Sequence, residues 1–109
     1  MKFFVKLLAV FLSVASVSSW AGDSDGLITI LYIQSPGVAL VKAGTIVNTP
    51  GCNTANQWAV SLSAPDGKSM YALLLQAQSQ GLPIGIHGDT GACGDWPDRE
   101  RPSYMYIVP

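Results

Sequence analysis

The side chains that could take part in acid–base chemistry are few. One histidine, His87, precedes a short run in which acidic and basic residues alternate: Asp95, Asp98, Arg99, Glu100 and Arg101. Asp95 and Glu100 could act as the acid and base of a small hydrolase. Alternating charges are more typical of a solvated or intersubunit ion-pair patch, which we expect here. The sequence therefore does not specify an enzyme.

The histidine and the cysteines do not indicate a metal site. Two cysteines alone, Cys52 and Cys93, cannot form a structural zinc site, and His87 does not complete a familiar ligand spacing with them. On a strand beside Gly88, the imidazole is expected to be a hydrogen-bonded residue at a barrel end rather than a general base. We predict no metal and no cofactor.

Tryptophan side chains are the better indication of a ligand site, because an indole has an apolar face that can stack on a sugar. Trp58 lies in an alternating apolar stretch and is expected in the core. Trp96 lies in a loop rich in Gly, Pro and Asp at residues 88–98 and is a candidate for contact with a ligand or partner. Tyr104 and Tyr106 share one face of a predicted strand and could line a subunit interface.

Residues 1–21 are typical of a signal peptide. Lys2 and Lys6 precede an apolar run, and the small residues Ser19 and Ala21 are placed for cleavage. A transmembrane anchor is the alternative, but serines interrupt the run and no basic stop-transfer flank follows it. We therefore predict a secreted or periplasmic protein with one mature domain over residues 22–109.

This predicted domain is small and acidic. The chain of 109 residues has a formal net charge of −1, and two of its basic residues fall in the predicted signal peptide, so nucleic acid is not an expected partner. A core of this size is only marginally stable, which favours a cross-link or an oligomer. Export makes a Cys52–Cys93 disulfide the expected pairing, with two free thiols as the alternative.

A helix followed by a returning strand is expected within residues 64–87. Apolar residues recur there at helical spacing: Met70, Leu73, Leu74 and Ala77. Asp66 or Ser63 is expected to cap the start of the helix, and Gly81 is expected to end it in the left-handed conformation. Pro83 follows, and the residues after it alternate as in a half-buried strand.

Four more strands are expected around this helix. Residues 27–33 are β-branched and apolar, which predicts a strand buried on both faces or covered by a neighbouring subunit. Residues 38–46 form a second strand with a bend near its end, residues 58–62 a third, and residues 104–108 the last. The order β-β-β-α-β-β predicts a mainly β, five-stranded OB-fold-like barrel with one helix. An open α+β sandwich is the alternative.

Two stretches carry a resemblance to a known family. Ser24-Asp25 precedes the apolar residues Leu27, Ile28, Leu31 and Ile33. The second stretch comprises helix, glycine stop and strand residues: Leu73, Leu74, Ala77, Gly81, Ile84, Ile86 and His87. Both resemble the B subunits of AB5 toxins of the subtilase-cytotoxin and typhoid-toxin type.

The resemblance implies a homopentameric ring that docks a catalytic A subunit and binds sialylated glycans of cell-surface glycoproteins or glycolipids. Ser24 would hydrogen-bond a sugar carboxylate or hydroxyl, and Asp25 would accept from hydroxyls; the alternative is a solvated lead before a strand. With Trp96 they form the predicted glycan-binding set. We expect a non-enzymatic, toxin B-subunit-like protein. A monomeric periplasmic accessory or inhibitor protein is the first alternative, and a hydrolase the second.

Overall fold

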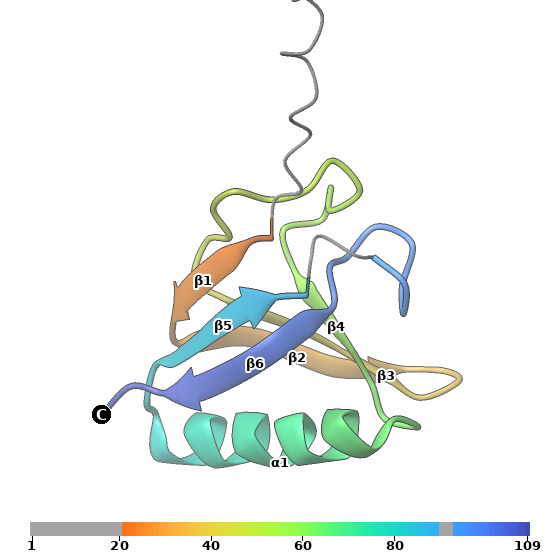
Figure 1. Cartoon of the computed structure of the whole chain (residues 1–109). Coiled ribbons are helices and arrows are strands. Elements are labelled where there is room, and N and C mark those ends of the chain that lie inside the picture. Colours follow the sequence, from red (N-terminus) through yellow and green to blue (C-terminus); the bar gives the residue numbers. More distant parts are fainter. Residues whose placement is uncertain (1–20, 90–92) are drawn as a thin grey trace, which may run out of the picture.

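The computed structural model describes residues 21–89 and 93–109 (Figure 1). Most of the predicted signal peptide, residues 1–20, lies outside the described residues. The elements, in chain order, are β1 (Asp23–Gly26), β2 (Ile28–Gln34), β3 (Val38–Ala43), β4 (Trp58–Ser61), α1 (Pro65–Gln80), β5 (Ile84–Gly88) and β6 (Pro102–Ile107). The strands form two three-stranded antiparallel sheets, β1-β5-β6 and β2-β3-β4. The chain is therefore a small, mainly β domain with one helix, as predicted. The more specific prediction of a five-stranded barrel is not confirmed, because the strands form two separate three-stranded sheets.

The two sheets meet through strands that follow each other closely. Only Leu27 separates β1 from β2, although each strand belongs to a different sheet. A second connection joins β4 to the segment just before β6. Trp58 of β4 forms a parallel bridge with Glu100, and the Ala59 amide donates to the Glu100 carbonyl over 2.9 Å. The polar lead before the first apolar strand was not predicted to be a strand; it forms β1, because its backbone pairs with β5.

The core lies between the sheets and the helix. Its fully buried members come from both sheets and from α1, and include Ala39, Val41, Trp58, Leu74, Ala77, Ile84 and Ile86. Met70 and Leu73 are partly buried and pack against this cluster. The apolar helix face predicted from the sequence is thus the face that meets the sheets.

The end of α1 agrees with its prediction and the start does not. Gly81 adopts the left-handed conformation, with φ 66° and ψ 31°, and its amide donates to the carbonyls of Ala77 and Gln78. At the start, Ala64 is the N-cap residue and no side chain caps it, so the predicted cap by Asp66 or Ser63 is wrong. Proline occupies the first helical turn and has no amide hydrogen, which leaves one donor fewer to satisfy.

Strand β2 is more exposed than predicted. Leu27 is 53% exposed and Ile33 50%, while Ile28 and Leu31 pack against the core from partly buried positions. The prediction of burial on both faces is wrong for the single chain, because β2 is an edge strand of its sheet. Its neighbour β3 is the buried strand. Cover of β2 by a neighbouring subunit stays a prediction.

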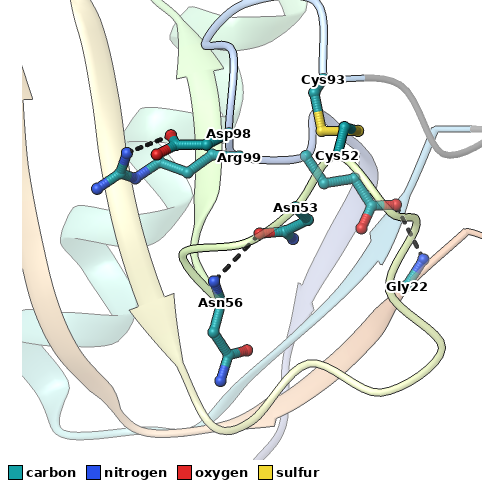
Figure 2. Close-up of a disulfide and its surroundings, with 8 residues drawn as sticks. Gly22, Cys52, Asn53, Asn56, Cys93, Asp98 and Arg99 are labelled. Atoms are coloured by element: carbon teal, nitrogen blue, oxygen red, sulfur yellow. Dashed lines mark hydrogen bonds and ion pairs between the residues drawn. A yellow bond between two sulfur atoms is a disulfide. The ribbon is translucent and has the colours of Figure 1, made fainter.

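A disulfide joins the two long loops. Cys52 and Cys93 are bonded, with their Cα atoms 6.2 Å apart, as predicted (Figure 2). Next to the bond, the Asn53 side chain accepts from the Asn56 amide over 3.1 Å, and the Asn56 side chain accepts from the Ile46 amide over 2.9 Å. A disulfide is typical of proteins of oxidising compartments. In residues 21–89 and 93–109, no helix is long and apolar enough to cross a membrane.

Candidate functional site

The outer face of the β1-β5-β6 sheet carries a groove. Strand register sets two cross-strand rows side by side on this face: Asp23–His87–Tyr104 and Asp25–Gly85–Tyr106. Because side chains alternate along a strand, the residues between them point to the opposite face. The groove has a volume of about 400 Å³ and is walled on one side by Thr45 and Val47, from the loop after β3.

Aromatic rings form an open shelf along this groove. The rings of His87 and Tyr104 stack with centroids 5.1 Å apart, and the rings of Tyr104 and Tyr106 are tilted, with centroids 6.4 Å apart. Tyr106 crosses directly over Gly85, where an added Cβ would lie 2.3 Å from the tyrosine Cζ. Tyr104 is 53% exposed and Tyr106 51%. The shelf therefore exposes aromatic surface, and the missing side chain at Gly85 allows the Tyr106 ring to lie across the strand.

Two carboxylates lie at the other end of the rows. Asp23 forms an ion pair with Nδ1 of His87, and its backbone is fixed by two hydrogen bonds with Val47, of 3.0 and 2.8 Å. Asp25 is exposed at the groove edge. Carboxylate oxygens only accept hydrogen bonds when ionised. The groove thus combines hydrogen-bond acceptors with exposed aromatic faces.

Ser24 borders this groove but its hydroxyl is directed inward. Lying between two outward aspartates, it is only 6% exposed, and its oxygen accepts a hydrogen bond of 2.9 Å from Nε1 of Trp58. This geometry does not support direct sugar contact by the Ser24 hydroxyl. Of the residues predicted to bind glycan, Asp25 alone presents its side chain at the groove.

Trp96 lies on the other sheet. It packs over Val38, Leu40 and Ala59, which form an apolar cluster on the outer face of β2-β3-β4. It does not line the groove. The structure therefore does not bring Trp96 together with Ser24 and Asp25.

The alternating charges near the C-terminus form ion pairs. Arg101 bonds Asp95 at 3.1 Å, and Arg99 bonds Asp98 at 2.6 Å. Glu100 does not belong to this surface, because its side chain is fully buried. Asp95 and Glu100 thus have different partners, and this arrangement favours the ion-pair interpretation over the hydrolase. Within the described ranges, no three His, Cys, Asp or Glu side chains gather to hold a metal ion.

Sequence reasoning missed most of the groove. Tyr104 and Tyr106 were recognised as sharing one face, but Asp23 and His87 were not joined to them. The sequence did contain a signal for the groove, because polar or aromatic residues occur at alternate positions in the stretches that form β1, β5 and β6. The register of these strands, however, depends on pairing between distant parts of the chain.

A comparison with models of known protein families, with curated proteins and with solved structures finds no match to this chain. The resemblance to AB5 toxin B subunits therefore stays a prediction. The geometry of the groove carries the functional argument.

Proposed function

We propose that this chain is an exported carbohydrate-binding protein that holds a sugar on the outer face of the β1-β5-β6 sheet. The observation that carries this proposal is the open shelf of Tyr104 and Tyr106, each about half exposed, beside the Asp23 and Asp25 carboxylates. Binding sites for small molecules combine apolar or aromatic surface with a few polar groups that fix orientation. A sugar ring requires both, because it has an apolar face and a rim of hydroxyls.

Each group has a distinct role in this proposal. The C–H face of the sugar stacks on Tyr104 and Tyr106, and Asp25 accepts hydrogen bonds from its hydroxyls. Asp23 orients the His87 ring through their ion pair, and His87 in turn supports Tyr104 by stacking. Ser24 acts as a positioning residue, since its bond to Trp58 fixes the strand between the two aspartates.

The proposed glycan is sialylated, as the family resemblance implies. A sialic carboxylate would have to avoid Asp23 and Asp25 and approach the protonated form of His87, the one group lining the groove that can become cationic. A neutral glycan would not face this repulsion. A glycan array that carries matched sialylated and neutral ligands distinguishes these two classes.

Assembly into a ring is the second part of the proposal. Four large apolar side chains on or beside edge strand β2 are exposed: Leu27, Ile30, Tyr32 and Ile33. An exposed, apolar edge strand is suited to pairing with another copy. The passage of β1 into β2 between the sheets, and the parallel bridge from β4 to Glu100, support an OB-type, partly open barrel. The ring would present five grooves and dock a toxin A subunit; a monomeric accessory or inhibitor protein is the alternative.

The test is a glycan array followed by titration of the best ligand. We expect Tyr104→Ala and Tyr106→Ala to weaken binding, whereas Leu75→Ala, at an exposed apolar residue of α1 that lines neither the groove nor strand β2, leaves it unchanged. Ser24→Ala removes no sugar contact and should lower stability more than affinity. Absence of binding to any glycan, or equal loss in the two tyrosine variants and in Leu75→Ala, would refute the site. Analytical ultracentrifugation separates the ring from the monomer.

A further inference from the structure

A buried carboxylate holds the backbone at the predicted start of the mature domain. The amide nitrogen of Gly22 donates to Oε2 of Glu100 over 2.9 Å in a fully buried setting, and Figure 2 marks this hydrogen bond at Gly22. Gly22 directly follows Ala21, the residue at which the predicted signal peptide ends. The nitrogen that cleavage would convert into an α-amino group therefore already contacts Glu100.

Glu100 is incompletely satisfied in this site. Its Oε1 atom is buried without a hydrogen-bond partner, and so is the side-chain nitrogen of nearby Asn53. In residues 21–89 and 93–109, no lysine or arginine forms an ion pair with Glu100. Burial raises the pKa of Glu100 above its usual 4.5 and the nearby Asp23 adds to the rise, while the hydrogen bond from the Gly22 amide and the nearby His87 act in the opposite direction. The carboxylate thus lacks the cation that would stabilise its charge.

The backbone at Gly22 and Gly88 lies too close to Glu100 to admit a side chain. A Cβ added at Gly22 would lie 2.6 Å from Oε1 of Glu100, and one added at Gly88 would lie 1.8 Å from Oε2. The two glycines therefore let the backbone approach the carboxylate closely. An ammonium on the Gly22 nitrogen carries three hydrogens and a positive charge, whereas the amide carries one hydrogen and no charge.

We infer that hydrolysis of the Ala21–Gly22 peptide bond by a signal peptidase completes this site, because the new α-ammonium group of Gly22 forms a buried ion pair with Glu100. Water adds across the peptide bond: Ala21 leaves with a carboxylate, and the Gly22 nitrogen becomes an amine that is protonated at neutral pH. A charge-assisted hydrogen bond is about twice as strong as a neutral one. Processing thereby stabilises the domain, and the unprocessed chain keeps an unpaired buried acid.

The first test compares three forms of the domain in urea: one that begins at Gly22 with a free amine, the same form N-acetylated, and one that begins at Ala21. The acetyl group occupies the place of the Ala21 carbonyl, so it fits the described backbone. We expect blocking the amine to raise the unfolded-to-folded ratio by about tenfold or more. In the Glu100→Gln background, blocking should change this ratio little. Equal stability of the free and acetylated forms would overturn the inference.

The pH dependence gives a second readout that does not require Glu100→Gln to fold. In the acetylated form, the raised pKa of Glu100 means that its contribution is most favourable below 4.5 and is lost as the pH rises through the folded-state pKa. In the free-amine form this loss should be absent, and stability should instead fall at alkaline pH as the ammonium deprotonates. His87 and Asp23 face the same site in both forms, so the difference between the two profiles isolates the amine. Superimposable profiles would contradict the ion pair.

The location of the cleavage site is checked on the exported protein. Intact mass and N-terminal sequencing should give Gly22 as the first residue, and an amine-reactive reagent should label this amine more slowly in the folded than in the unfolded protein. A start at another residue, or equal labelling rates, would overturn the inference. Sugar binding plays no part in these measurements, so their failure is distinct from failure of the proposed function.

Discussion

The outer faces of the two sheets differ in how far the rest of the chain covers them. On β2-β3-β4, the apolar side chains of Val38, Leu40 and Ala59 are covered by Trp96, which comes from the loop that the disulfide ties down. On β1-β5-β6, Tyr104 and Tyr106 lie open beside the groove. The chain itself thus closes the β3–β4 part of one outer face, which we call the closed face, whereas the tyrosines of the other outer face are left accessible.

The contrast separates an aromatic residue that packs against the domain from aromatic residues that remain exposed. Trp96 covers buried neighbours, so its ring is part of the packing of the domain. Removing Tyr104 or Tyr106 exposes little buried apolar surface, because each ring is already about half exposed. An aromatic side chain that the fold does not need for cover is the better candidate for ligand contact.

The largest effect is expected where the two sheets meet. Trp58 is fully buried in β4, and its indole nitrogen donates to Ser24 of β1. Trp58→Ala should lower the free energy of unfolding by about 3–5 kcal/mol, because it leaves a cavity between the sheets. Urea denaturation followed by circular dichroism measures this loss. A loss below about 1 kcal/mol would mean that Trp58 does not hold the two sheets together.

Removing the disulfide should act mainly on the closed face. The Cys52→Ser/Cys93→Ser double variant loses a cross-link over a sequence separation of 41, which we expect to cost about 2–4 kcal/mol of unfolding free energy. The loop that carries Trp96 should become more mobile. The groove, which is formed by strands β1, β5 and β6, should keep its sugar affinity as long as the protein is folded. Trp96 fluorescence and a binding titration at low temperature follow the two effects. Loss of affinity equal to the loss of order at Trp96 would show that the faces are not independent.

The sequence predicted the features that depend on local chemistry. The left-handed glycine after α1, the apolar helix face and the alternation around Ile84 and Ile86 are all set by neighbouring residues. The disulfide was predicted from the presence of two cysteines in a chain predicted to be exported. The helix and strand features depend on a few neighbouring residues, and the two cysteines allow a single pairing. None of these predictions therefore required knowledge of strand pairing.

The candidate site depended on distant pairing and was not predicted as a unit. Asp23 meets His87 only because β1 pairs with β5, and His87 meets Tyr104 only because β5 pairs with β6. Ser24 was assigned to the sugar because of the family resemblance, yet alternation in β1 turns it toward Trp58. Glu100 was grouped with its charged neighbours, although its burial separates it from them.

Exchanging aromatic residues for alanine on the two faces should give opposite results. Tyr104→Ala should weaken sugar binding by about tenfold, close to 1.4 kcal/mol, with little change in stability. Trp96→Ala should lower the free energy of unfolding by about 1–3 kcal/mol and leave sugar affinity unchanged. Isothermal titration and urea denaturation of both variants test the pair. If Trp96→Ala abolished binding while Tyr104→Ala did not, the ligand would lie on the closed face.

The smallest effects on stability are expected from exposed carboxylates on the two faces. Asp98 is 47% exposed at its side chain and pairs with Arg99, while Asp25 is exposed at the groove. Exposed ion pairs contribute about 0–1 kcal/mol, so Asp98→Asn and Asp25→Asn should each change the unfolding free energy by no more than this amount. Only Asp25→Asn should weaken sugar binding, because an amide is a poorer acceptor for sugar hydroxyls than a carboxylate. Titrations of both variants against the same glycan measure the difference, and equal affinities would remove Asp25 from the site.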